Sequence, residues 1–195
     1  NKPPQEGIEQ YYRDIAEQVP DMPIVMYDIP GRTGRGVHID TIRRLAKSVP
    51  NIVGLKDAAG DPEATKLLIQ DPDMPDDFVV YSGDDSLNLA LASRGAVGAI
   101  SVASHWVGER QQAMYSALDD DNFADAERIH AQLSTSYAFE SSDSTPNPLP
   151  TKTYLALEGR IRSDYTRPPM QVGHATKLGL VQAAHALRRE VAEAE

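Results

Sequence analysis

The chain has 195 residues, of which 41% are hydrophobic and 25% charged, a composition typical of a folded globular protein and unlike that of disordered or fibrous chains. Its formal net charge of -10 disfavours binding to nucleic acid, because an acidic surface repels phosphates. The absence of cysteine excludes disulfides, thiolate metal sites and cysteine nucleophiles. The longest apolar runs are too short to cross a bilayer, so we expect a cytoplasmic protein without a membrane partner.

Short apolar, β-branched runs alternate with longer amphipathic stretches over the first half of the chain, which is typical of parallel βα units. The runs lack polar alternation, as expected of parallel strands covered on both faces. The predicted strands are residues 23–27, 52–55, 78–81 and 98–102. The predicted helices beside them are residues 8–19, 39–48, 62–69 and 86–94.

After the last predicted strand the pattern changes to helices only, with proline-rich breaks between some of them. These predicted helices are residues 107–118, 123–139, 150–157 and 172–192. The order fits either the second half of a (β/α)8 barrel or part of an open doubly wound sheet, and neither GxGxxG nor GxxxxGK is present to favour nucleotide binding. We predict two domains, the βα part in residues 1–118 and a helical extension in residues 119–195.

The polar residues that close the apolar runs are the candidates for chemistry, because barrel enzymes place catalytic groups at the C-terminal ends of strands. Lys56 closes such a run, and desolvation there would favour the neutral, nucleophilic amine that imine formation requires. The alternative is a lysine that extends from the strand end to pair with a carboxylate such as that of Asp57.

Other polar residues lie at neighbouring strand ends. The phenol of Tyr27 can relay protons or hold a substrate carboxylate, although most such tyrosines only pack and hydrogen-bond. Arg32, in a Pro- and Gly-bounded loop, has the planar fork that suits a carboxylate, unless it is an ordinary surface arginine. Asp84 and Asp85 are explained as an N-cap turn.

The five histidines lack paired ligand spacing and no GxSxG occurs, so we predict neither a metal site nor a Ser-His-Asp hydrolase.

Residues 27–34 read YDIPGRTG and residues 54–60 read GLKDAAG. In order and spacing these segments resemble the dihydrodipicolinate synthase (4-hydroxy-tetrahydrodipicolinate synthase) family of pyruvate-dependent class I aldolases, whose segments read Y-N-[IV]-P-x-R-T-G and G-[IL]-K-[ED]-A-x-G. Asp28 stands where the family usually has Asn, which changes the local hydrogen bonding of the loop and not the chemistry. Further matching segments are residues 1–7, 81–85, 98–102 and 146–152.

The resemblance implies a (β/α)8 barrel, of which this chain would hold about four strands, and a C-terminal helical extension. It implies a homotetrameric lyase of lysine and diaminopimelate biosynthesis that condenses pyruvate with L-aspartate 4-semialdehyde. Lys56 would form the Schiff base and Tyr27 would relay protons. Arg32 would receive the carboxylate of the semialdehyde, while Gly83 and Ile100 would line the pyruvate pocket. No cofactor is expected, because the protonated imine is itself the electron sink.

Arg32 favours the synthase over N-acetylneuraminate lyases and 2-keto-3-deoxy-sugar aldolases, which usually lack arginine at this place. Two alternatives stay open: a related aldolase acting on a sugar acid, and a non-catalytic half-barrel partner. The chain begins at Asn1 and looks like a piece of a longer protein, since a complete barrel needs about 250 residues. We expect this chain alone to be inactive or poorly folded and the whole protein to be the enzyme.

Overall fold

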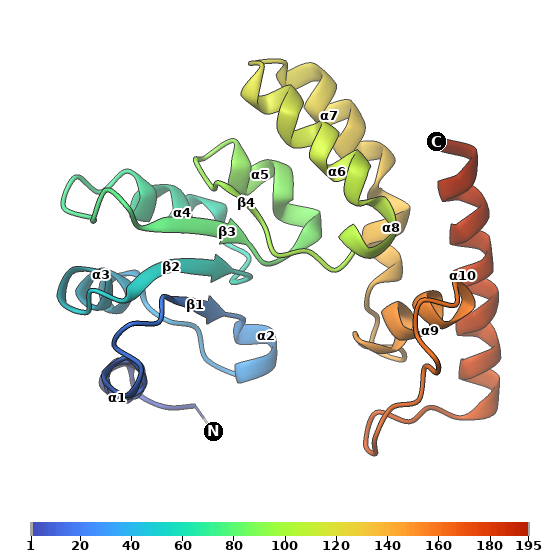
Figure 1. Ribbon diagram of the computed structural model, residues 1–195, viewed down its shortest axis with the longest axis horizontal. Helices are drawn as coiled ribbons and strands as arrows, with labels where there is room; N and C mark the ends of the chain where they lie inside the picture. Colours follow the sequence, from blue (N-terminus) through green and yellow to red (C-terminus); the bar gives the residue numbers. More distant parts are fainter. Residues whose placement is uncertain (1, 195) are drawn as a thin grey trace. The chain divides into compact units, whose positions relative to one another are not determined.

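The structure, a computed structural model, describes residues 2–194 and divides into two compact units, Asn1–Ser101 and Val102–Glu195. The first unit contains a parallel four-stranded sheet in the order β1-β2-β3-β4, so β1 and β4 are its outer strands (Figure 1). The predicted α/β class with a parallel sheet is confirmed. The strands are β1 (Ile24–Asp28), β2 (Ile52–Asp57), β3 (Val79–Ser82) and β4 (Gly98–Ala99). The helices of this unit are α1 (Gln5–Gln18), α2 (Pro30–Thr33), α3 (Ile39–Ser48), α4 (Pro62–Ile69), the 3-10 turn η1 (Asp85–Leu87) and α5 (Asn88–Ala92).

Local sequence signals account for most of these boundaries. Asp61 caps α4 by accepting a hydrogen bond from the Ala64 N–H at 3.2 Å, and Pro62 follows at the first helical position, where its missing N–H has no cost. The predicted ranges of α3 and α4 agree with the structure. The short helix α2 was not predicted, because four residues are too few to show a helical period.

The hydrophobic core of the first unit lies on one face of the sheet. Met26, Leu55 and Val80 project from β1, β2 and β3 into it and are each at most 3% exposed. Helical side chains complete this core, including Ile42, Leu45, Leu68 and Leu91. The other face of β1 is open in the part of the chain that the structure describes, since Val25 and Tyr27 are 39% and 40% exposed. The expectation that the strands are covered on both faces is therefore wrong for β1.

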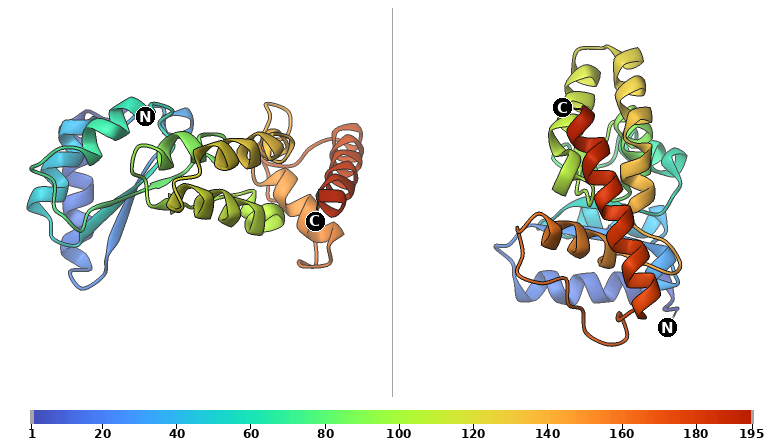
Figure 2. Two further views of the ribbon diagram at one scale, coloured as in Figure 1. Left: turned by 90° about the horizontal axis from the view of Figure 1, so that it is seen from above. Right: turned by 90° about the vertical axis from the view of Figure 1, so that its right-hand side faces the viewer.

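The second unit is helical (Figure 2). Trp106, Phe139 and Tyr154 form an aromatic cluster there, with ring centroids 5.0 to 6.4 Å apart. The predicted single helix of residues 123–139 is wrong: it breaks at Leu133, whose N–H bonds at 3.1 Å to the His130 carbonyl three residues back. The helices are α6 (Ser104–Asp119), α7 (Phe123–Gln132), α8 (Ser134–Phe139), α9 (Leu149–Leu157) and α10 (His174–Ala194).

The division into units assigns α6 to the second unit, whereas the predicted domain boundary follows residue 118. Because compactness alone does not define a domain of the whole protein, the boundary after residue 118 stays a prediction. None of the helices in residues 2–194 is both long enough and apolar enough to cross a membrane.

Candidate active site at the strand ends

A row of side chains crosses the open face of the sheet near the C-terminal ends of the strands. Tyr27 of β1 is paired with Lys56 of β2, Lys56 with Tyr81 of β3, and Tyr81 with Gly98 of β4. Paired residues of neighbouring strands point to the same face of a sheet. The lysine nitrogen Nζ lies 4.2 Å from the centroid of the Tyr27 ring, within the range of a cation–π contact. The structure therefore brings the two predicted catalytic residues together.

Gly83 follows β3 directly and leaves room for the lysine. A Cβ atom added at Gly83 would lie 2.9 Å from Cγ and 3.0 Å from Cε of Lys56. The Gly83 N–H donates to the Asp57 carbonyl at 2.7 Å, which ties the segment after β3 to the end of β2. Any larger residue at this position would displace the Lys56 side chain, so sterics explain the glycine at position 83.

Ile100 follows β4, and its N–H donates to the Ser82 carbonyl at 2.8 Å. Its side chain is 45% exposed. Ile100 thus stands at the same edge of the sheet as Gly83, one strand further from Lys56. Its role in lining a pyruvate pocket stays a prediction.

The surroundings of Lys56 favour its neutral form. Burial lowers the pKa of the Lys56 amine, and the Asp85 carboxylate opposes this by stabilising the ammonium. For Tyr27, burial raises the pKa of the phenol, while the positive charge of Arg32 lowers it and Asp84 raises it. An amine with a lowered pKa beside a protonated phenol is suited to nucleophilic attack on a carbonyl followed by proton transfer.

The two aspartates after β3 have different environments, which the sequence did not reveal. Asp84 is the predicted cap: its carboxylate accepts from the N–H of Ser86 at 3.0 Å and from its hydroxyl at 2.6 Å. Asp85 is only 4% exposed, accepts from the Asn88 amide at 2.9 Å and acts electrostatically on Lys56. Its explanation as part of the cap alone is incomplete, and no feature of the sequence distinguishes the two acids.

Arg32 lies on α2, where Gly34 ends the helix with a left-handed φ of 74°. Arg32 is exposed, and its positive charge lowers the pKa of the Tyr27 phenol. Asp28, at the end of β1, is 5% exposed and accepts a hydrogen bond from the Val37 N–H at 3.2 Å. The acid that stands in place of the usual Asn therefore closes the loop that contains Arg32.

Among the described residues, 2–194, no three His, Asp or Glu side chains gather into a group that could hold a metal ion.

The fold and the site define a class of α/β proteins in which a parallel sheet holds a lysine and a tyrosine side by side at its strand ends. The model of the Dihydrodipicolinate synthetase family matches residues 1–186, and the chain belongs to this family. The resemblance seen in the sequence segments is thereby confirmed.

Relatives of the chain include named synthases. It is 45% identical over 159 residues to the 4-hydroxy-tetrahydrodipicolinate synthase of Synechococcus elongatus, covering 82% of this chain and 52% of that protein. The enzyme of the same name from Prochlorococcus marinus is 40% identical over 190 residues, covering 97% and 61%. The chain thus spans about half the length of the first of these relatives.

Solved structures agree with the sequence comparison. The dihydrodipicolinate synthase of Cyanidioschyzon merolae, crystallised with lysine bound, is 39% identical and superposes with a TM-score of 0.84. The overlap covers 95% of this chain and 61% of that one. The synthase of Thermotoga maritima is 30% identical with a TM-score of 0.85, covering 98% and 63%.

Proposed function

We propose that the protein to which this chain belongs is a lyase that condenses pyruvate with L-aspartate 4-semialdehyde to give 4-hydroxy-tetrahydrodipicolinate. The observation that supports this most strongly is the Lys56 nitrogen held 4.2 Å from the Tyr27 ring, beside Gly83, in a chain 45% identical to a named synthase. No cofactor is required, since the protonated imine of Lys56 would withdraw the electrons.

In the proposed mechanism the neutral amine of Lys56 attacks the C2 carbonyl of pyruvate, and loss of water gives an imine. Loss of a proton from C3 gives the enamine, whose C3 then adds to the aldehyde carbon of the semialdehyde. Attack of the semialdehyde's amino group on the imine carbon closes the ring and releases the Lys56 amine. Tyr27 relays protons in these steps. Arg32 binds the carboxylate of the semialdehyde, and Gly83 and Ile100 line the pyruvate pocket.

We also propose that β1 to β4 form half of a (β/α)8 barrel, with α6 to α10 as its last barrel helix and C-terminal extension. In the described residues the outer edges of β1 and β4 have no neighbouring strand, and an unpaired edge is a liability that barrels remove. We therefore expect synthase turnover from the intact protein and not from these 195 residues alone. Normal turnover of the isolated chain would refute this.

A homotetramer in the cytoplasm is the proposed form of the intact protein, by the family resemblance. One similar structure is described as a monomeric dihydrodipicolinate synthase variant, so family membership alone does not fix the assembly. Light scattering on the intact protein tests this: a mass of one subunit would contradict the proposal.

The substrate is tested by supplying the intact protein with pyruvate and either aspartate semialdehyde or N-acetylmannosamine. Consumption of pyruvate only with aspartate semialdehyde is the expected result, because the Arg32 guanidinium matches a carboxylate. Arg32→Lys serves as the control, since it keeps the charge and removes the planar fork. Pyruvate consumption with N-acetylmannosamine and not with aspartate semialdehyde would contradict the proposed synthase and indicate a sugar-acid aldolase.

A further inference from the structure

The loop that contains Arg32 is tied to the sheet at its base. It runs from the end of β1 to the start of α3 and includes α2. The buried Asp28 carboxylate accepts a hydrogen bond from the Val37 N–H at 3.2 Å. Residues 34–38 thus join α2, which contains Arg32, to the start of α3, and Val37 ties them to the end of β1.

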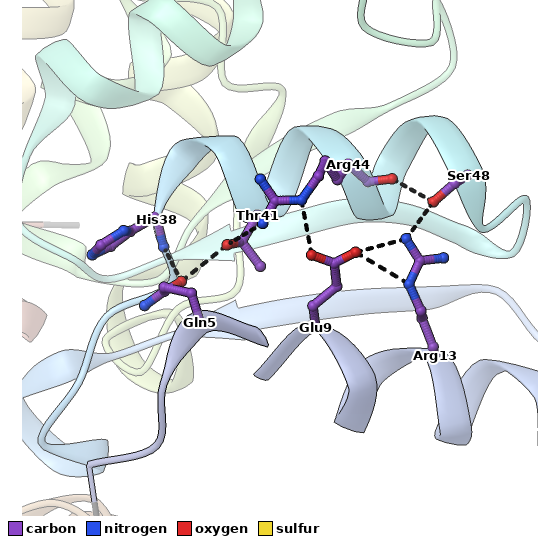
Figure 3. Close-up of polar contacts among 7 residues, drawn as sticks. All are labelled: Gln5, Glu9, Arg13, His38, Thr41, Arg44 and Ser48. Atoms are coloured by element: carbon purple, nitrogen blue, oxygen red, sulfur yellow. Dashed lines mark hydrogen bonds and ion pairs between the residues drawn. The ribbon is translucent and has the colours of Figure 1, made fainter. Parts of the chain in front are cut away.

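Gln5, in the first turn of α1, forms hydrogen bonds with this segment and with α3, and Figure 3 shows those to His38 and Thr41. Its side-chain NH2 group donates to the Gly36 carbonyl at 3.0 Å. Its side-chain oxygen accepts from the His38 N–H at 2.8 Å and from the Thr41 hydroxyl at 3.1 Å. A primary amide carries donors and an acceptor on one planar group, so Gln5 can join both the loop and the first turn of α3.

We propose that Gln5 is a positioning residue for Arg32, and that its hydrogen bonds set the affinity of the site for the carboxylate of the aldehyde substrate. This inference rests on the proposed function. Arg32 lies on α2, which begins two residues after β1 ends, so the arginine follows the strand that carries Tyr27. The contacts of Gln5 go to residues 36–41, outside the Lys56–Tyr27 pair. Attack on pyruvate should therefore not depend on Gln5.

Glu9, one turn further along α1, provides a matched control. Its carboxylate accepts from Arg13 at 2.8 Å and from Arg44 of α3 at 2.8 Å, and Arg13 also donates to Ser48 of α3 (Figure 3). Both Gln5 and Glu9 join α1 to α3, but the partners of Glu9 lie within these helices, outside residues 34–38. Loss of the Glu9 carboxylate weakens the same contact between α1 and α3 and leaves the hydrogen bonds of residues 34–38 in place.

The experiment compares Gln5→Leu with Glu9→Leu in the intact protein. For Gln5→Leu we expect the KM for aspartate semialdehyde to rise about tenfold, with the rate of pyruvate trapping by borohydride unchanged. For Glu9→Leu we expect both quantities to stay within about twofold of the unsubstituted protein. Gln5→Glu, which keeps an acceptor for His38 and Thr41 and loses the donor to Gly36, should give an intermediate KM.

Each result decides the inference. Equal rises in KM for Gln5→Leu and Glu9→Leu would overturn it, because the effect would then come from helix packing. Slower pyruvate trapping in Gln5→Leu would also overturn it. If Gln5→Leu does not fold, Gln5→Glu decides: a raised KM for aspartate semialdehyde supports the inference, and an unchanged KM overturns it. Absence of trapping in the unsubstituted protein would instead overturn the proposed function itself.

Discussion

The two faces of the sheet are built by the same strands and have opposite properties. On one face Leu55 is 3% exposed in a core with Met26 and Val80. On the other face the next residue, Lys56, meets Tyr27 and carries an amine with a lowered pKa. Because successive side chains of a strand point to opposite faces, neighbours can serve different purposes. Substitutions one residue apart should therefore separate stability from chemistry.

The largest effect is expected for Tyr27→Phe on the open face. This change keeps the aromatic ring next to Lys56 and removes the hydroxyl that would relay protons. We expect kcat of the intact protein to fall by about 10²- to 10⁴-fold, the usual range for loss of a general acid or base. The free energy of unfolding should change little, since Tyr27 is 40% exposed. Steady-state kinetics and urea unfolding measure the two effects, and an unchanged kcat would remove Tyr27 from the mechanism.

Leu55→Ala tests the covered face. The side chain is 3% exposed within the core, so its truncation leaves a cavity. We expect the free energy of unfolding to fall by about 2–5 kcal/mol. Borohydride trapping at Lys56 should persist under conditions where the variant is folded. Loss of trapping in the folded variant would mean that the two faces are not independent.

A smaller effect is expected for Asp85→Asn, which removes the charge that stabilises the Lys56 ammonium. Without it the pKa of Lys56 should fall further, because burial then acts unopposed. The neutral amine becomes available at lower pH, so the rising limb of the pH–rate profile for imine formation should move to lower pH. At pH 7 the rate should increase by less than about tenfold. Asp84→Asn is the control, since Asp84 acts on Tyr27 and caps η1. An equal shift of the pH–rate profile in Asp84→Asn would refute the specific effect of Asp85 on Lys56.

The smallest effect concerns Asp28, a buried acid on the covered face. Burial, the largest cause, and the charge of Asp57 raise the pKa of the Asp28 carboxyl, while the Val37 N–H lowers it. The folded protein thus holds this proton more tightly than the unfolded chain, and the stability from protonation is lost as pH rises through the folded pKa. Asp28→Asn should raise the free energy of unfolding by about 0.5–1 kcal/mol at pH 7. The gain should vanish below about pH 4, the ordinary Asp pKa; an equal gain at both pH values would contradict this account.

Elements with a strong local signal were predictable from the sequence. The ranges of α3 and α4 follow from amphipathic periodicity and, for α4, from the Asp61–Pro62 start. The strand-end rule also selected Lys56 and Tyr27 as candidates, because it needs only the end of each apolar run, and the structure places the Lys56 nitrogen 4.2 Å from the Tyr27 ring. The break at Leu133 was missed, since a one-residue tight turn does not disturb the hydrophobic pattern.

Features that depend on which segments pack together were not predictable. A register irregularity at Ile24/Val25 pairs Ile52 with Ile24 and Gly54 with Val25. Ile52 consequently joins the core with Leu55, although simple alternation would place it on the face of Lys56. The contacts of Gln5 span more than 30 residues of sequence and exist only because α1 packs on α3. Local sequence patterns do not predict such long-range pairings.

The most direct test of the central claim is to treat the intact protein with pyruvate and borohydride and to locate the adduct by peptide mass spectrometry. Lys56→Ala serves as the control. We predict a reduced pyruvyl adduct on the peptide that contains Lys56 and none in Lys56→Ala. A folded, intact protein that gives no adduct, or an adduct on a different lysine, would contradict the assignment of Lys56 as the nucleophile.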